Sequence, residues 1–363
     1  MEMSGDGLVM SFGRKELHRK NPIADEETML RSPGKYAVEL HELAAQYLKN
    51  EDLNASVKLF ELLLVHFKSE YGNLHHTVGS CLHNIGVVRL RSQDYDQALL
   101  NFEQAVRVRK GSMGKDHADV AVSLVKVGIT QLLLHKFDEA LYSFRDALSI
   151  RRHALGHLHP STARIYNNIG CVHVEFNELR QARRAFESAL DVQRNALCDE
   201  PENAQLLFGA ATTLCNLGYL YSSRGAHERT CLVLKEAADF QQRVFGSAHP
   251  TVLSILDSLA ESYAKRGDNL NALQTYNEIV VSLENDEGNG RVLSSRKKRA
   301  IAIVFYKMSR IHKKQNDHET SLRFLHNSES YVKELRAPNL LEKVEEEINQ
   351  VKQELRKSDF DWV

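Results

Sequence analysis

The chain has 363 residues, of which 42% are hydrophobic and 26% charged, and its formal net charge is −1. This balance is typical of a soluble globular protein, and near-neutrality argues against nucleic acid as a main partner, because nucleic acid favours strongly basic surfaces. No apolar run reaches the roughly 18–20 residues that cross a bilayer, so we expect no membrane insertion. The five cysteines show no CxxC pairing and the N-terminal residues show no apolar signal, which predicts reduced thiols in a cytoplasmic or nuclear protein, most simply a cytoplasmic one.

Residues 1–34 contain clusters of glycine, proline, serine and asparagine and show no helical period. This pattern predicts a flexible N-terminal tail. Helical periodicity begins near Lys35, where the leucines and alanines that follow match the first helix of a repeating unit.

The rest of the chain repeats itself at a step of 42 residues. Gly86, Gly128 and Gly170 are separated by 42 residues each, Gly218 follows after 48, and Ala260 after another 42. A chain that repeats one amphipathic unit in this way stacks the units side by side to bury a shared core. An elongated surface, rather than a closed catalytic pocket, is the expected product, so we expect the function to lie in binding.

A second set of small and aromatic residues follows each glycine at fixed distances. Ala98, Phe102 and Ala105 are spaced i, i+4, i+7, which places them on one face of a helix. A polar turn separates this helix from the helix that carries the glycine. Each unit is therefore predicted to be a helix–turn–helix hairpin. The equivalent residues in the next two units are Ala140, Phe144 and Ala147, and Ala182, Phe186 and Ala189.

Two units are longer than the others. Six extra residues lie around 199–203 and seven around 284–290, and such insertions either fall in connecting loops or lengthen the next helix. The basic run at 296–299 is read as the solvated start of a helix, with a nuclear-import signal as the alternative.

Residues 338–357 carry apolar residues at alternating spacings of three and four, from Leu341 to Leu355. Two heptads are too short to indicate a coiled coil by themselves. We expect a capping helix that covers the last repeat, with dimerisation through the same stripe as the alternative. An acidic-aromatic tail, 358–363, follows.

The linkers between units contain histidines at one recurring position, namely His75, His117, His159 and His249. Equivalent positions in stacked units are separated by layers of about 10 Å, so these rings cannot converge on one metal, whose bonds to nitrogen are about 2 Å. We predict instead that each glycine three residues earlier ends a helix in the left-handed conformation and that each histidine starts the next helix. No phosphate-binding loop, nucleophile motif or metal-ligand spacing is found, and we expect neither an enzyme nor a cofactor.

These motifs resemble tetratricopeptide repeats, and the 42-residue period resembles the repeat domain of kinesin light chains. The Gly-x-x-His-Pro linkers at 156–160 and 246–250, and the Asn-Asn-Ile and Cys-Asn-Leu segments before Gly170 and Gly218, are similar to that family's motifs. The resemblance implies an all-α right-handed superhelix of about seven repeats over 35–337. Kinesin light chains carry a long heptad segment ahead of the repeats, and only 34 aperiodic residues precede them here, so binding to a kinesin heavy chain is not expected.

The resemblance also implies a concave groove lined by the first helices of the repeats. Asparagine suits such a wall because its amide both donates and accepts hydrogen bonds, and can hold the backbone of an extended peptide; the alternative is that these amides only satisfy neighbouring turns. Basic residues there would favour acidic segments. The predicted groove residues are His83, Asn84, Arg91, Lys126, Arg164, Asn167, Asn168, Asn216 and Tyr219.

We therefore predict a monomeric, non-catalytic adaptor that binds short peptide segments of other proteins, including acidic-aromatic ones, in this groove. The alternative is a structural subunit docked in a larger assembly through its outer face or its C-terminal helix, and a third possibility is an enzyme regulator modified in its tail or near 284–299. The kinesin light chain resemblance further suggests the hypothesis that the tail containing Trp362 folds back as an intramolecular plug; the alternative is a disordered end with no partner.

Overall fold

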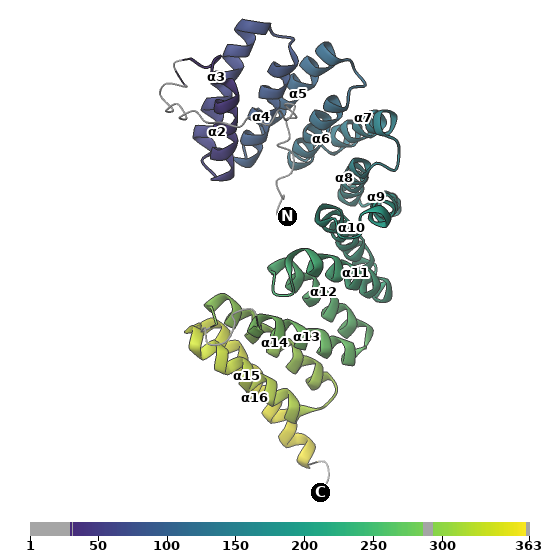
Figure 1. Cartoon of the computed structure of the whole chain (residues 1–363). Helices are drawn as coiled ribbons and strands as arrows, with labels where there is room; N and C mark the ends of the chain where they lie inside the picture. The colour runs from purple at the N-terminus through teal and green to yellow at the C-terminus, as the bar shows by residue number, and fades with distance from the viewer. Residues whose placement is uncertain (1–29, 31, 286–292, 361–363) are drawn as a thin grey trace. The chain divides into compact units, whose positions relative to one another are not determined.

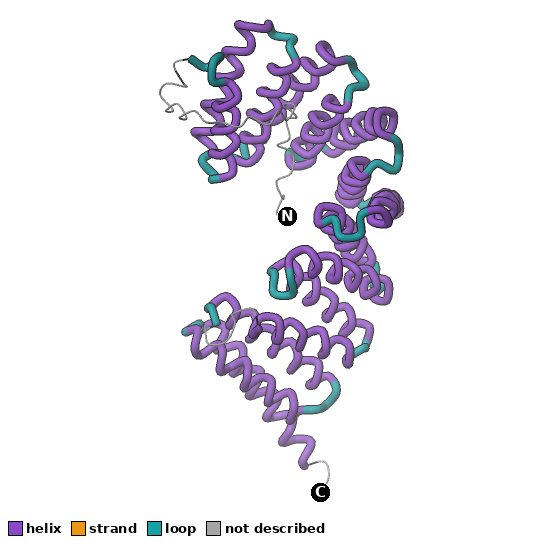
Figure 2. The backbone as a smooth tube through the Cα atoms, in the orientation of Figure 1, coloured by secondary structure: helices purple, strands orange, loops and turns teal. Residues whose placement is uncertain are grey.

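The structure, a computed structural model, describes residues 30, 32–285 and 293–360, and these form helices joined by short turns, with no strand among them (Figures 1 and 2). The predicted tail 1–34 lies almost entirely outside the described residues. Of the predicted tail 358–363, α16 includes the first three residues, and Trp362 lies outside the described residues. The all-helical repeat fold is confirmed.

The chain divides into two compact units, and their boundary in the sequence falls within α9: unit 1 ends at Val192 and unit 2 starts at Gln193. In each unit, helices that are consecutive in sequence pack against one another. Unit 1 contains α2 (Ala37–Lys49), α3 (Leu53–Tyr71), α4 (His76–Arg91), α5 (Tyr95–Met113), α6 (Ala118–Leu133), α7 (Phe137–Leu155), α8 (Pro160–Glu175) and most of α9 (Leu179–Asp199). Unit 2 contains α10 (Ala204–Ser223), α11 (His227–Phe245), α12 (Pro250–Arg266), α13 (Asn269–Asn285), α14 (Ser295–Lys314), α15 (His318–Leu335) and α16 (Pro338–Phe360).

The recurring glycine and phenylalanine meet inside three successive hairpins, α4–α5, α6–α7 and α8–α9. Phe102 and Phe144 are completely buried, and their rings lie against Gly86 and Gly128 of the preceding helices. The glycine is required because a methyl group at this position would overlap the ring. In unit 2 the pair changes: Leu234 packs against Gly218, and Tyr276 takes the phenylalanine position of the next repeat.

The turn inside each hairpin contains one residue with positive φ. Gln93, His135 and Asn177 adopt φ values of 61°, 58° and 56°, and the equivalent position in two later turns is Gly225 or Gly267. The left-handed conformation is accessible to any residue but is strained unless the residue is glycine or, to a lesser degree, asparagine. This residue reverses the direction of the chain, so the second helix of the hairpin begins directly after the turn.

The linker histidines act as helix N-caps, as predicted. Each ring accepts a hydrogen bond at Nδ1 from the backbone N–H two residues later, for example His117 from Asp119 at 3.1 Å and His159 from Ser161 at 3.2 Å. An N-cap acceptor satisfies one of the backbone donors that a helix start leaves free.

The prediction for the linker glycines is wrong in one respect. Gly72, Gly114, Gly156 and Gly246 have φ between 82° and 92°, but their ψ values of 156–169° are far from those of the left-handed helical conformation. This region of backbone space is open almost only to glycine. The linkers therefore demand glycine more strictly than a left-handed cap would.

The six extra residues of the fourth-to-fifth unit step lengthen two helices and leave the length of the linker between them unchanged. α9 has 21 residues and α10 has 20, whereas α7 has 19 and α8 has 16. Asn203 caps α10 by accepting from the backbone N–H groups of Gln205 and Leu206. The second insertion falls largely on residues 286–292, outside the described residues.

α16 covers the outer side of α15 at the end of unit 2. Val344, Ile348 and Val351 are at most 5% exposed and form one cluster with Leu325 of α15. At the polar edge, Lys313 Nζ of α14 lies 2.8 Å from a Glu347 carboxylate oxygen. The apolar stripe predicted for residues 338–357 thus packs against the last hairpin.

Candidate functional site

The predicted site residues of unit 1 lie on α4, α6 and α8, which are the first helices of three successive hairpins. Arg91 and Arg164 are exposed, whereas Lys126, Asn167 and Asn168 are half-buried. At least part of each of these five side chains is accessible to solvent.

His83 and Asn84 are only 3% exposed each. Asn84 Nδ2 donates to His41 Nε2 of α2 at 3.1 Å, and burial lowers the pKa of His41, which keeps its ring neutral and able to accept. Two helical turns further on, Arg91 donates to the Leu48 carbonyl of α2 at 3.1 Å. Polar contacts thus join the first helices of the first two hairpins, and the amide of Asn84 takes part in this joint.

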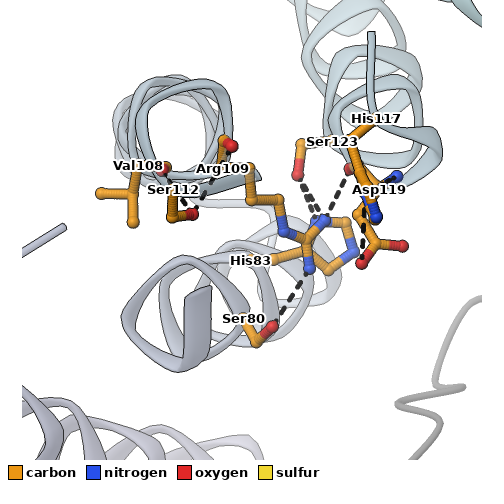
Figure 3. A network of polar contacts seen from close by, with 8 residues as sticks. All are labelled: Ser80, His83, Val108, Arg109, Ser112, His117, Asp119 and Ser123. Atoms are coloured by element: carbon orange, nitrogen blue, oxygen red, sulfur yellow. Dashed lines mark hydrogen bonds and ion pairs between the residues drawn. The ribbon is translucent and has the colours of Figure 1, made fainter. Parts of the chain in front are cut away.

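A buried arginine holds three consecutive helices of unit 1 together (Figure 3). Arg109 of α5 is 5% exposed and donates from Nη1 to the Asp119 carbonyl at 2.9 Å and to Ser123 Oγ at 2.8 Å, both on α6. Its Nη2 lies 3.4 Å from Ser80 Oγ on α4. Burial lowers the pKa of Arg109, and the nearby Asp119 carboxylate partly offsets this effect.

His83 shares this network. Its Nδ1 lies 3.2 Å from Ser123 Oγ, and its ring packs edge-on against Phe102 with centroids 5.4 Å apart. Since Ser123 Oγ accepts from Arg109, its hydroxyl hydrogen is free to donate to His83, which assigns an unprotonated Nδ1. Burial, followed by the positive charges of Arg109 and Lys126, lowers the pKa of His83 well below its ordinary value. The ring is neutral and belongs to the core of the repeat stack.

Sequence reasoning missed Arg109. The available signal was its recurrence, because Arg151 follows it by 42 residues and donates to Ser161 Oγ at 3.4 Å. A basic residue that recurs on the second helix is easily mistaken for part of a solvated face. Its burial becomes visible only when the neighbouring helices are in place.

α8 carries an uninterrupted polar stripe. Arg164, Asn167, Asn168 and Cys171 are spaced i, i+3, i+4, i+7, and therefore share one face of the helix. Within the described part of the chain, Asn168 Nδ2 has no hydrogen-bond partner. Arg151 lies within electrostatic reach of Arg164, so positive charge accumulates next to an amide donor.

In unit 2, Asn216 and Tyr219 lie on α10, half-buried and 67% exposed respectively. Further along the unit, Lys307 of α14 bonds Asp257 at 2.7 Å and Glu261 at 2.7 Å, both on α12. The first helices of the last two hairpins are thus joined by ion pairs, in the position where His41 and Asn84 join those of the first two.

Among the described residues, no group of three or more potential metal ligands occurs, and no helix is long and apolar enough to span a membrane. The cysteines form no disulfide among these residues. Burial raises the pKa of Cys81 and Cys215 to about 12 and, with the Glu175 carboxylate, that of Cys171 to about 11, so these thiols are protonated and poorly nucleophilic.

Helical hairpins that repeat along the chain and stack on one another define a helical repeat protein. Models of the tetratricopeptide repeat match residues 37–111, 119–195 and 210–251, which is more than half of the chain. The chain belongs to the tetratricopeptide repeat family. A comparison with curated proteins finds no match.

Several solved structures are similar. The C-terminal part of a TPR repeat-containing protein from Cytophaga hutchinsonii has a TM-score of 0.53 and 10% identity, over 80% of this chain and 95% of that one. BtubC (BKLC) from P. vanneervenii has a TM-score of 0.49 and 18% identity, over 74% and 96%. The TPR-like repeats of a kinesin light chain from Podosopora anserina have a TM-score of 0.37 and 15% identity, over 71% and 99%. Likeness at these identities concerns the fold alone.

Proposed function

We propose that this chain is a non-catalytic scaffold that holds peptide segments of other proteins against the first helices of its repeats. The observation that carries the proposal is the polar stripe of α8, where an exposed arginine and two half-buried asparagines share one helix face. Membership of the tetratricopeptide repeat family supports a role in protein–protein interaction.

The side chains of the stripe suit an extended peptide. An asparagine amide can donate to a peptide carbonyl and accept from a peptide N–H, so it binds backbone without selecting side chains. Lys126 and Arg164 would favour acidic segments through charge, and the half-buried amides of Asn167 and Asn168 share the helix face of Arg164. Buried His83 and Asn84 would act indirectly, by holding neighbouring first helices in place. A shallow site of this kind fits affinities near micromolar, about −8 kcal/mol.

The test is a selection of peptides from a displayed random library on the full chain, followed by affinity measurements. We expect the selected peptides to be enriched in acidic residues. Binding should weaken about tenfold in the Lys126→Glu/Arg164→Glu variant, because the change reverses two charges on the proposed wall. The matched control, Arg107→Glu/Arg145→Glu, changes two exposed arginines of the second helices α5 and α7 and should leave affinity unchanged.

Two results would contradict the proposal. One is a selection that yields no peptide with measurable affinity. The other is the reverse pattern, in which the control variant loses binding and the Lys126/Arg164 variant retains it.

A second candidate function, docking into a larger assembly through the second helices, is favoured by one observation. Leu100 of α5 and Tyr142 of α7 occupy the same repeat position and are 49% and 75% exposed. Exposed large apolar residues that recur at one position are typical of a protein interface. If this reading is right, Leu100→Ser/Tyr142→Ser would release a co-purifying protein that Lys126→Glu/Arg164→Glu retains. A monomeric, cytoplasmic chain is the simplest setting for either function.

A further inference from the structure

Unit 2 contains a pocket of about 300 Å³ where α12, α13 and α14 meet. This volume is at the lower end of the range for ligand-binding pockets in proteins. The walls are partly apolar, formed by Ala264, Ile311 and the ring of Tyr276, and positively charged side chains stand around them. The remaining lining residues are Glu261, Lys265, Asn269, Lys307, Arg310 and Lys314.

Tyr276 marks this pocket as different from the rest of the repeat core. It occupies the position that Phe102, Phe144 and Phe186 fill in earlier repeats, and it is only 2% exposed. A buried phenol normally finds a hydrogen-bond partner, since leaving its hydroxyl unpaired costs free energy. Within the described residues no hydrogen bond involves this hydroxyl, and Tyr276 is one of the residues that line the pocket. Burial and the carboxylates of Asp257 and Glu261 raise the pKa of Tyr276, so the phenol is protonated and able to donate.

The positive charges at the pocket are of two kinds. Lys307 is neutralised, because it contacts both Asp257 and Glu261 at 2.7 Å. Lys265, Arg310 and Lys314 are exposed, and none of the three forms an ion pair within the described part of the chain. The net charge of the whole chain is −1, yet three cations without an ion pair lie around this partly apolar pocket. Tyr276 adds a hydroxyl donor to them. This combination indicates an anionic ligand with an apolar part.

We propose that the α12–α14 pocket binds an acidic peptide segment that inserts one large apolar side chain between Ala264, Ile311 and the ring of Tyr276. The inference rests on the proposed scaffold function and places one of its binding sites in unit 2. Carboxylates on either side of the inserted residue pair with Lys265, Arg310 and Lys314, and the Tyr276 hydroxyl donates to a peptide carbonyl. Glu261 at the pocket edge disfavours a nucleic-acid backbone, whose phosphates are closely spaced along its whole length.

The experiment measures fluorescence anisotropy of a labelled synthetic peptide in which one phenylalanine stands between two pairs of glutamates, added to the full chain. Lys265→Glu/Arg310→Glu/Lys314→Glu should weaken binding at least tenfold. The control variant Lys235→Glu/Arg299→Glu/Arg323→Glu makes the same charge change at exposed residues of α11, α14 and α15 that do not line the pocket, and should bind the probe as the wild type does.

Two further arms separate the contributions. Tyr276→Phe restores the residue found in other repeats, so it should fold normally while binding the probe a few-fold more weakly. A probe with alanine in place of phenylalanine tests insertion, and we expect it to lose most of the affinity. Raising the salt concentration should weaken the original probe, because exposed charges are screened.

Three outcomes would overturn the inference: no binding of the probe to the wild type, equal binding to both triple variants, or displacement of the probe by single-stranded DNA at lower concentration than by unlabelled peptide. The scaffold proposal would survive any of them if library-selected peptides still depended on Lys126 and Arg164. If library-selected peptides did not depend on Lys126 and Arg164 while the probe still bound, the proposed binding surface of unit 1 would be overturned. The proposal for the α12–α14 pocket would then stand by itself.

Discussion

Gly128 lies so close to Phe144 that a Cβ atom added to the glycine would stand 2.7 Å from ring carbon Cε1. The same approach, at the same distance, recurs between Gly86 and Phe102 one repeat earlier. Real Cβ atoms essentially never come this near to another carbon, so these two hairpins close only because the first helix has no side chain at this position. This contact explains why glycine and phenylalanine recur together with the period of the repeat.

Replacing this glycine should therefore destabilise unit 1. We expect Gly128→Ala to lower the free energy of unfolding by about 1–3 kcal/mol, because completely buried Phe144 must move within a packed core. The control is Gly111→Ala in α5, where the nearest atom to an added Cβ is 3.8 Å away. Since alanine favours helix more than glycine, this control should gain about 0.5–1 kcal/mol. Chemical unfolding followed by circular dichroism measures both, and equal effects would contradict the steric account.

The two kinds of positive-φ glycine should respond differently to asparagine. Gly246 has φ 82° and ψ 163°, whereas Gly267 has φ 84° and ψ 6°. Asparagine tolerates the second conformation, and Asn177 and Asn316 already adopt positive φ at positions equivalent to Gly267. We expect Gly246→Asn to cost about 1–3 kcal/mol and Gly267→Asn distinctly less. Unfolding midpoints of the two variants, which lie in the same unit, provide the comparison.

Buried His83 should make the stability of unit 1 depend on pH. Its pKa is lowered in the folded state, so below about pH 6.5 the unfolded chain binds a proton that the folded chain does not. The unfolded state is then favoured as the pH falls, and stability decreases below that value and is retained above it. We expect His83→Gln to be less stable than the wild type at pH 7.5, with the difference shrinking by about 1 kcal/mol at pH 5.5. A difference that is constant across this range would show that His83 is protonated in the fold.

The C-terminal helix should stabilise unit 2 within a single chain. Ile348 is 5% exposed in the cluster formed by α15 and α16, and we expect Ile348→Ala to cost about 2–5 kcal/mol. Exposed Glu346, two residues earlier on the same helix, is the control and should tolerate alanine with little change. Sedimentation of both variants and the wild type should show monomers. Dissociation of a dimer by Ile348→Ala would instead support the alternative in which the apolar stripe of this helix pairs two chains.

Much of the fold could be predicted because its determinants are local and repeated. The spacing of Ala98, Phe102 and Ala105 predicts one helix face, and all three are completely buried. The sequence also predicts that the linker histidines start helices. This prediction is possible because the cap requires only an acceptor two residues ahead of a backbone N–H. The conformation of the linker glycines was not predicted correctly, since the choice of ψ depends on where the next hairpin packs.

The candidate site could be predicted only in part. A repeat position identifies Asn84, Asn168 and Asn216 as equivalent, yet Asn84 is buried against His41 while the other two are half-buried. The difference arises from the neighbour, because a histidine on α2 happens to lie within reach of one amide. Likewise, Tyr276 in place of phenylalanine is visible in the sequence, but the pocket beside its hydroxyl is not.

The amino-acid sequence alone determined the helical hairpins, their number and their period, because helix faces, turns and caps depend on residues within a few positions of one another. Only the tertiary structure decided which polar side chains are used between helices and which remain available to a partner. That outcome depends on how closely adjacent helices approach, and shifts of one or two ångströms separate a hydrogen bond such as that of Asn84 to His41 from an exposed amide.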